Sequence, residues 1–493
     1  MSRRLLRSFV CTLAFASSAA SAVALNPRGV GDVLIYPYYT VNRGQDTLFT
    51  LVNSADTAKV ARVRFLEGYD GRTVFATYVF LSAHDVWTAA ITQVGDEDGA
   101  KIATSDTSCT FPVQTSGATP FASDDYTGPN ADTGPSSITR TREGSIEVIE
   151  AADIQPGSAA EAAITHVQNG QPGGGVPPCT FATAAGAQPI DLADLAPPTG
   201  GLFGSASIVD VGVGTFFAYA ATALTGFSDV VPVDDLTDET QPSLDQAHSS
   251  ESPATARAYV PIDRVGTVAL DYDDGIDAVS AVLMSSSISN EFLTDPGLGA
   301  NTDWVITFPT KRFYVDDARY PGARIAPFVE AFGNAVAGQS RLGFGITTFD
   351  REELSPEASG CGFICPGTPP TYLSYEVNIF GFLNAGAGTP SGVLGSVLSA
   401  FYGNPPTIVH RGDEGWVDIS LFSGDGGHVM PGTLSTGENV SIHGLPMAGF
   451  MVYNVVNANA QPGVLGNYGG AFPHRSTLAC SDIDGLPCPI VNN

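Results

Sequence analysis

The chain has 493 residues, with 51 acidic and 22 basic side chains, and a formal net charge of −29 at pH 7. Such a field repels polyanions, so the composition argues against nucleic acid and anionic lipid as partners. The chain contains no run of eighteen apolar residues, and we therefore expect no membrane-spanning helix.

The first 24 residues are predicted to form a secretory signal peptide. Three arginines within the first seven residues precede an apolar run that ends near Ala16. Small residues follow, with A-x-A cleavage options after Ala22 and Ala24. We therefore expect an exported protein at the cell surface or outside the cell, with the periplasm as the alternative.

Residues 25–228 are predicted to form an immunoglobulin-like β-sandwich domain. In residues 34–68 short apolar runs alternate with polar residues, and turn-forming residues separate them at the spacing of paired strands. The alternating residues are Ala61, Val63 and Phe65 against Arg62 and Arg64. This pattern predicts one buried face and one wet face.

Two further features interrupt this domain. Residues 103–140 are rich in Ser, Thr, Gly, Pro and Asp, which indicates a long exposed loop insertion. Ser158 and Glu161 form a capping-box pattern that predicts one short helix, which Asn169-Gly170 ends.

Residues 229–256 are acidic and poor in aromatic residues, and they are predicted to form a linker to a second β domain, residues 257–493. Strand patterns in that part include "DWVITFP", "YLSYEVNIFGF" and "GWVDISLF". The predicted fold class is mainly β: two immunoglobulin-like β-sandwich domains with long Gly-, Pro- and Asp-rich loops and few short helices.

Six cysteines remain after the predicted cleavage, and an even number in an exported chain indicates disulfides. Proximity in the sequence suggests the pairs Cys361–Cys365 and Cys480–Cys488, which leaves Cys109 and Cys179 to close a long loop. Six cysteines allow fifteen connectivities, so the sequence alone does not decide among them.

Three phrases, "LIYPYYTV", "DWVITFPTKRFYVDDA" and "GLPMAGF", resemble a group of exported proteobacterial proteins described only as cell-surface or hypothetical. The resemblance implies an envelope or extracellular setting in a Gram-negative bacterium. It implies no catalytic residue.

Calcium is the ligand that the sequence suggests. In "DYDDGID" four aspartates, Asp271, Asp273, Asp274 and Asp277, surround Gly275 in a pattern similar to half of an EF-hand loop. The glycine stands one position early and no glutamate occupies the twelfth position, so a calcium site in a sandwich loop is the hypothesis and a solvated turn is the alternative.

One basic pair stands out in this acidic chain. Lys311 and Arg312 lie between aromatic residues and precede Asp316 and Asp317. Two interpretations are open: they pair locally, or they bind an acidic patch of another copy. The triplet Asp132-Thr133-Gly134 matches an aspartic-protease motif, but it has no second copy and is interpreted as loop.

These observations predict a non-enzymatic, exported structural or adhesive protein that binds other copies or other envelope components. The alternative is a secreted carbohydrate-binding protein or glycoside hydrolase with a cleft between the two domains.

Overall fold

The computed structural model describes residues 22–95, 98–112, 117–168, 171–181, 187–322, 324–354, 372–382, 392–398, 412–422 and 427–488. Nearly all of the predicted signal peptide lies outside these ranges. Its last residues belong to strand β1 (Val23–Leu25), which pairs with strands on both sides. Cleavage after Ala22 would leave β1 in its sheet, whereas cleavage after Ala24 would remove most of it.

The chain is mainly β, as predicted, and its largest sheet has thirteen strands. Along the sheet these are β33 (Ala479–Asp482), β28 (Asn439–His443), β27 (Val429–Leu434), β18 (Gly266–Tyr272), β17 (Ala256–Ile262), β1, β16 (Thr222–Thr225), β2 (Val33–Thr40), β10 (Glu143–Ile154), β4 (Ala58–Glu67), β5 (Thr73–Leu81) and β8 (Cys109–Phe111), with β13 (Leu195–Ala196) beside β10.

A second sheet of six strands packs on one face of this sheet. Its order is β15 (Thr215–Ala220), β14 (Leu202–Asp210), β3 (Gln45–Asn53), β6 (Val86–Gln93), β7 (Ala100–Thr104) and β9 (Gly117–Pro120). The core between the two sheets contains Ala61, Val63 and Phe65 of β4, as their alternation predicted, together with Phe49 and Trp87 from the six-stranded sheet. Two sheets that share an apolar core form a β-sandwich.

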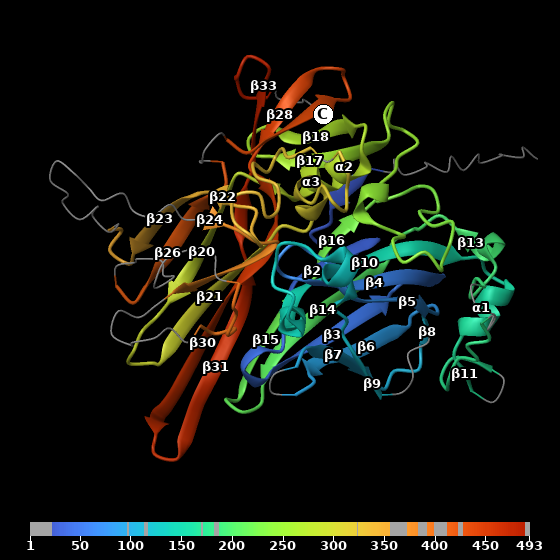
Figure 1. Cartoon of the computed structure of the whole chain (residues 1–493), viewed down its shortest axis with the longest axis horizontal. Coiled ribbons are helices and arrows are strands. Elements are labelled where there is room, and N and C mark those ends of the chain that lie inside the picture. Colours follow the sequence, from blue (N-terminus) through green and yellow to red (C-terminus); the bar gives the residue numbers. More distant parts are fainter. Residues whose placement is uncertain are drawn as a thin grey trace, which may run out of the picture.

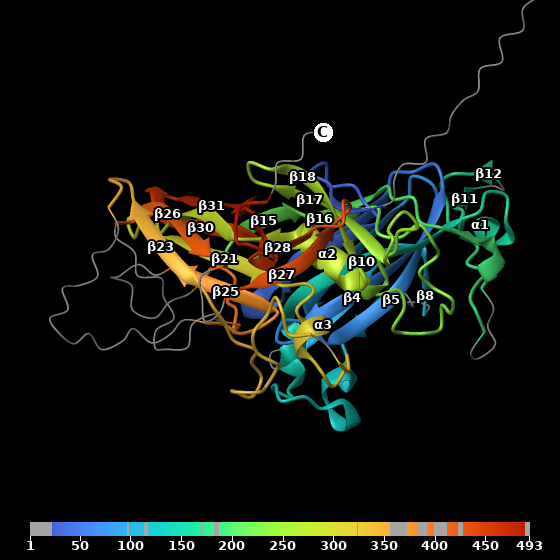
Figure 2. The same cartoon turned by 90° about the horizontal axis from the view of Figure 1, so that it is seen from above.

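The C-terminal half adds two sheets of four strands. One has the order β23 (Gly345–Asp350), β26 (Glu414–Ser420), β20 (Ser287–Leu293) and β32 (Arg475–Thr477); the other has β25 (Val377–Phe382), β21 (Ala300–Thr307), β30 (Ala448–Gln461) and β31 (Val464–Pro473). Three two-stranded pairs complete the strands: β11 (Val167–Gln168) with β12 (Gln171–Pro172), β19 (Met284–Ser285) with β29 (Leu445–Pro446), and β22 (Leu342–Gly343) with β24 (Tyr372–Leu373). In Figures 1 and 2, β23 and β26 lie at one end of the long axis and β11 lies at the other.

Three α-helices occur in the described ranges: α1 (Ala159–Ile164), α2 (Gly275–Leu283) and α3 (Arg312–Val315). Ser158 caps α1 as predicted, because its hydroxyl accepts the Glu161 N–H, but the Glu161 carboxylate accepts the Gly157 N–H and does not complete the box. The helix ends at Ile164, earlier than the predicted end at Asn169-Gly170. Helix α2 is buried along its whole length against β17 and β1, which suits a sequence that is apolar except for Asp277 and Ser280. None of these helices has the length or the apolar composition that a membrane crossing needs.

The predicted boundary at residues 229–256 does not separate two sheets. Strands from both sides of it share the thirteen-stranded sheet, because β17, at the end of the segment, pairs with β1, which precedes it. The sheet then continues through β18 to β27. The segment itself packs on the protein: Leu236 and Leu244 are buried, at 1% and 0% exposure. Its composition is acidic and poor in aromatic residues, and composition alone therefore indicated a free linker.

The same segment corrects the prediction of a wet face on β4. Arg62 and Arg64 are buried, because residues 239–242 cross over their side chains. Arg64 Nη2 donates to the Thr240 carbonyl at 2.8 Å, and Arg62 Nη2 donates to the Glu239 carbonyl at 3.2 Å. Buried guanidinium groups need such acceptors, and backbone carbonyls provide them here.

Candidate functional site

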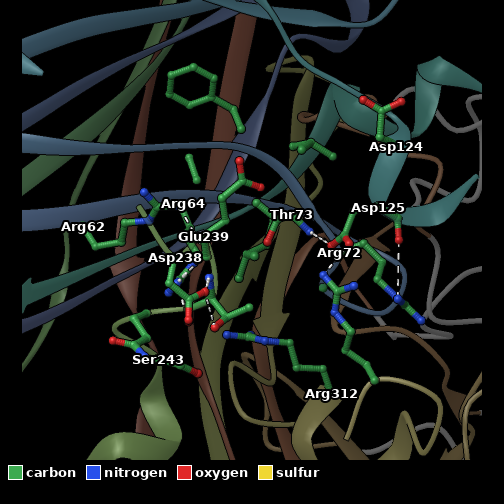
Figure 3. A pocket seen from close by; sticks show the side chains of 18 of the residues that line it. Arg62, Arg64, Arg72, Thr73, Asp124, Asp125, Asp238, Glu239, Ser243 and Arg312 are labelled. Atoms are coloured by element: carbon green, nitrogen blue, oxygen red, sulfur yellow. Dashed lines mark hydrogen bonds and ion pairs between the residues drawn. The ribbon is translucent and has the colours of Figure 1, made fainter. Parts of the chain in front are cut away.

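A polar cavity of about 1110 Å³ lies where residues 236–246 cross the outer face of β4 and β5. The turn between these strands, the loop that contains residues 122–130 and the segment around α3 provide the remaining walls. Figure 3 shows Arg62 and Arg64 beside Asp238 and Glu239 on one side, and Arg72 beside Asp125 on the other.

Five arginines line this cavity in a chain that has only 22 basic residues: Arg62, Arg64, Arg72, Arg312 and Arg319. Seven acidic residues accompany them: Asp70, Asp124, Asp125, Asp238, Glu239, Asp245 and Asp316. The walls therefore carry both donors and acceptors in comparable numbers, unlike the rest of this acidic protein.

Arg72 occupies a central place in this arrangement because it bridges two carboxylates. Its Nε lies 3.3 Å from Asp70 Oδ2, and its Nη2 lies 2.7 Å from Asp316 Oδ2. At the cavity rim, Arg319 pairs with Asp125. These ion pairs fix the direction in which each guanidinium group points.

A buried group of charges continues behind Asp70. Arg140 Nη2 lies 2.5 Å from Asp70 Oδ1 and 2.7 Å from Asp132 Oδ2, and it also contacts Glu67. Burial, followed by repulsion from Glu67, raises the pKa of Asp70 well above its usual range. Burial would also raise the pKa of Glu67, but the Arg140 guanidinium overcomes this effect and lowers it to about 2.

Asp132 belongs to the triplet Asp132-Thr133-Gly134, and the structure gives the triplet a role other than catalysis. Asp132 accepts both Arg140 Nη1, at 2.9 Å, and the Gly134 N–H, at 2.7 Å. Thr133 Oγ1 accepts the Gly338 N–H at 3.1 Å. The triplet therefore anchors the 122–142 loop, whereas the sequence indicated only a free loop.

Lys311 and Arg312 are buried, at 2% and 6% exposure, and so cannot bind an acidic patch of another copy. Their partners lie within the same chain, but they are distant in the sequence and are not the neighbouring Asp316 and Asp317. Arg312 Nη2 lies 2.6 Å from Glu147 Oε2, and its Nη1 lies 3.0 Å from Glu376 Oε1. Glu147 also accepts Arg64 Nη1 at 3.1 Å, which connects β4, β10 and α3.

Burial changes the proton affinity of two groups next to Arg312. Lys311 Nζ donates to the carbonyls of Ser340 at 2.7 Å and Tyr375 at 3.1 Å, and burial lowers its pKa to about 7. Burial raises the pKa of Glu376 to about 8, against the opposing effect of Arg312. Both shifts follow from the cost of burying a charge.

The four aspartates of the predicted calcium loop do not converge on one point. Asp271 pairs with Arg257, at 2.8 Å. Arg324 contacts both Asp274 and Asp277, and Asp277 also accepts Tyr314 Oη at 2.7 Å.

Asp273 lies in the turn before α2 and is exposed. The loop thus continues into helix α2, and arginine side chains pair with the carboxylates of Asp271, Asp274 and Asp277. Among the residues that the structure describes, no three His, Cys, Asp or Glu side chains are grouped so as to hold a metal ion.

Two predicted disulfides are present, Cys109–Cys179 and Cys480–Cys488. Cys361 and Cys365 lie outside the described residues. The first bond connects β8 to the segment after α1, and the second holds the turn after β33.

A second cavity of about 390 Å³ adjoins the first and shares Asp245, Arg319 and Tyr320 with it. Asp274 and Arg324 also line it. The sequence contained no signal for these two cavities, because the walls of the first come from segments more than 200 residues apart. No family model, curated protein or solved structure matches the chain.

Proposed function

We propose that this chain is a non-enzymatic, exported adhesive protein of a bacterial cell surface that binds carbohydrate in the arginine-lined cavity. The observation that carries the proposal is the mixed wall of fixed donors and acceptors around Arg72. Sugar hydroxyls both donate and accept hydrogen bonds, so they complement such a wall. A small number of precisely placed polar groups is what gives a pocket its specificity.

The pairing of the charges favours a neutral ligand over an anion. Arg72, Arg312 and Arg319 already hold carboxylates, so a phosphate would have to displace them. The adjoining second cavity lengthens the site, which suits an oligosaccharide better than a single sugar. The disulfides, together with the signal peptide and the resemblance to cell-surface proteins that the sequence predicts, support the proposed location.

A glycoside hydrolase is the second candidate, because two carboxyl groups beside Arg72 have raised proton affinity. Burial raises the pKa of Asp316 above its usual value, and it raises that of Asp70 well above. A carboxyl group with a raised pKa suits a general acid. The ion pairs that hold both groups favour binding without cleavage.

The test is to screen the mature chain for binding to a panel of neutral oligosaccharides. For each sugar that binds, titration calorimetry measures the affinity and product analysis shows whether the sugar is cleaved. Arg319→Gln and Asp124→Asn alter the cavity at exposed or half-exposed positions. We expect at least one sugar to bind uncleaved, and each variant to weaken its binding about tenfold.

Arg351→Gln is the matched control, because Arg351 is exposed, pairs with Glu414 and does not line the cavity. It should bind as the unaltered protein does. Binding that survives both cavity variants, or a folded protein that binds no sugar of the panel, would contradict the proposal. If the unaltered protein shortens a sugar and Asp316→Asn does not, this result would favour the hydrolase.

A further inference from the structure

The outer face of the six-stranded sheet is almost free of charge. On its inner face Phe49, Ile208 and Phe217 belong to the sandwich core. On four of its six strands, β15, β14, β3 and β6, the outward positions are Phe216, Ala218, Ala220, Phe203, Ser205, Ser207, Val209, Asp46, Leu48, Thr50, Val52, Val86, Thr88, Ala90 and Thr92. Asp46 is the only charged residue among them.

Large apolar side chains on this face are open to solvent. Phe216 is 55% exposed, Leu48 and Val86 are each 44% exposed, and Phe203 is 39% exposed. The strand register places Phe203 opposite Val52, and Val52 opposite Val86, so these three side chains form one row across three strands. Neighbouring residues in such a row lie within contact distance.

A second row connects Ala218, Ser207 and Leu48 to Ala90. Between the two rows lie Ala220, Ser205, Thr50 and Thr88, so small side chains, three of them hydroxyls, separate the larger apolar groups. An antiparallel sheet with one face in water normally alternates apolar and polar residues, and its wet face carries charges. An exposed sheet face that carries large apolar side chains and almost no charge indicates an interaction surface.

The charge of the chain decides what kind of partner fits. A chain with a net charge of −29 repels its own copies over most of its surface. This face carries Asp46, the Asp106 carboxylate accepts from Thr88 at its border, and Lys101 on the neighbouring β7 adds one positive charge. With so few charges, repulsion between two such faces is small. A cationic partner would find few carboxylates here.

The size of the face also fits a second copy. Four strands about 4.8 Å apart, each extending about 3.4 Å per residue, give a face roughly 15–20 Å by 30 Å. This planar area of about 450–600 Å² is of the same order as the about 800 Å² that each partner buries in a standard interface. Sheet faces pack on one another about 10 Å apart.

Growth at the β15 edge of the sheet is less open than packing on its face. Strand β15, which forms one edge, lies against β31 of another sheet. Asn467 Nδ2 of β31 donates to the Val213 carbonyl just before β15, at 2.5 Å. We propose that two copies of the chain associate through the outer faces of their six-stranded sheets and form a symmetric dimer.

The test is the molar mass of the mature chain in light scattering and sedimentation velocity over a range of concentrations. We expect a dimer that persists or strengthens in high salt, because salt screens the repulsion and leaves the apolar contact intact. The double variant Phe203→Glu with Phe216→Glu should be monomeric. Val464→Glu, which changes a 49% exposed residue on β31, should remain dimeric.

A cross-linking experiment decides the case in which the double variant does not fold. Ser207→Cys places a thiol in the middle of the face, and a short bismaleimide should join two copies through it. Ser289→Cys, on the outer face of the β20 sheet, is the matched control and should not be joined. The proposal would be overturned if the unaltered chain is monomeric, or if the two cysteine variants are cross-linked to the same extent. It would also be overturned if the chain is a monomer that binds neutral lipid vesicles through this face.

Discussion

Arg140 and Glu67 form a two-point ion pair in the interior of the protein. Arg140 Nε lies 2.7 Å from Glu67 Oε2, and its Nη2 lies 3.0 Å from Oε1. Both side chains are fully buried. The Tyr126 ring centroid lies 4.4 Å from the guanidinium carbon and covers it. The pair connects the end of β4 to the loop that precedes β10.

Arg140→Met should destabilise the protein by about 3–5 kcal/mol, because the substitution leaves buried carboxylates without their counter-ion. Urea unfolding at pH 7 measures this loss. Arg475→Met is the control: Arg475 is 69% exposed and lies 3.4 Å from Glu291, and the loss of an exposed pair costs about 0–1 kcal/mol. Equal losses in the two variants would contradict the prediction.

The loss in Arg140→Met should also depend on pH. Because the pKa of Glu67 is lowered to about 2 in the folded state, its contribution is present above the unfolded value of 4.5 and is lost as the pH falls through 2. The difference between the variant and the unaltered protein should therefore shrink as the pH falls from 4.5 towards 2.

Asp303 predicts a pH effect of the opposite sign. It is buried on β21, its Oδ2 accepts the Leu394 N–H at 2.8 Å, and burial raises its pKa from 3.8 to about 7. A raised carboxyl pKa favours folding below pH 3.8, and this contribution is lost as the pH rises to 7. In the unaltered protein this effect lowers the free energy of unfolding by up to about 4 kcal/mol between pH 3.8 and pH 7, and Asp303→Asn should abolish it.

Asp32 provides an internal comparison, because burial raises its pKa to about 6. Asp32→Asn should reduce the decline in the free energy of unfolding only up to pH 6. Asp303→Asn should reduce this decline up to pH 7. Urea midpoints at half-unit pH intervals measure both. A slope that neither variant changes would show that these carboxyl groups are not neutral in the folded protein.

The sequence identified those features that depend on neighbours along the chain. The alternation of Ala61, Val63 and Phe65 correctly predicted their burial, because a strand places every second side chain on one face. Ser158 was correctly predicted to cap a helix, since capping is local. The pairing of Cys480 with Cys488 followed from proximity in the same way.

What the sequence did not identify depends on contacts between distant segments. Arg62 and Arg64 were expected in water, and residues 175 or more positions away in the chain bury them. Lys311 is buried beside carbonyls of Ser340 and Tyr375, which no local pattern indicates. The cavity around Arg72 also joins segments that lie far apart, so the pattern of any one of them is that of an ordinary turn or loop.

The two disulfides should differ in their effect on stability. Cys109 and Cys179 are separated by 70 positions, and Cys480 and Cys488 by 8. Because a cross-link that closes a longer loop removes more entropy from the unfolded chain, the loss is about 4 kcal/mol for the first pair and about 2.5 kcal/mol for the second.

Replacement of each pair by serine, followed by urea unfolding without reductant, measures these losses. The double variant of Cys109 and Cys179 should have the lower midpoint, and reductant should lower the midpoint of the unaltered protein. The reverse order between the two variants would show that strain or residual structure outweighs loop entropy here.

Arg64 should control how firmly residues 236–246 cover the cavity. Its guanidinium donates to the carbonyls of Glu239, Thr240 and Pro242, which lie in the segment first expected to be a linker. Arg64→Met removes all three bonds and leaves these carbonyls without their donor. Amide hydrogen exchange should therefore accelerate at residues 236–246, because local opening of the segment becomes easier.

Arg257→Met is the control for this experiment, because Arg257 pairs with Asp271 at 2.8 Å on the neighbouring strands β17 and β18. Its substitution should leave exchange at residues 236–246 unchanged. Sugar binding should weaken in Arg64→Met but not in Arg257→Met, since a segment that opens no longer holds Asp238 and Glu239 in the cavity wall. Unchanged exchange in Arg64→Met would mean that Leu236 and Leu244 alone hold the segment in place.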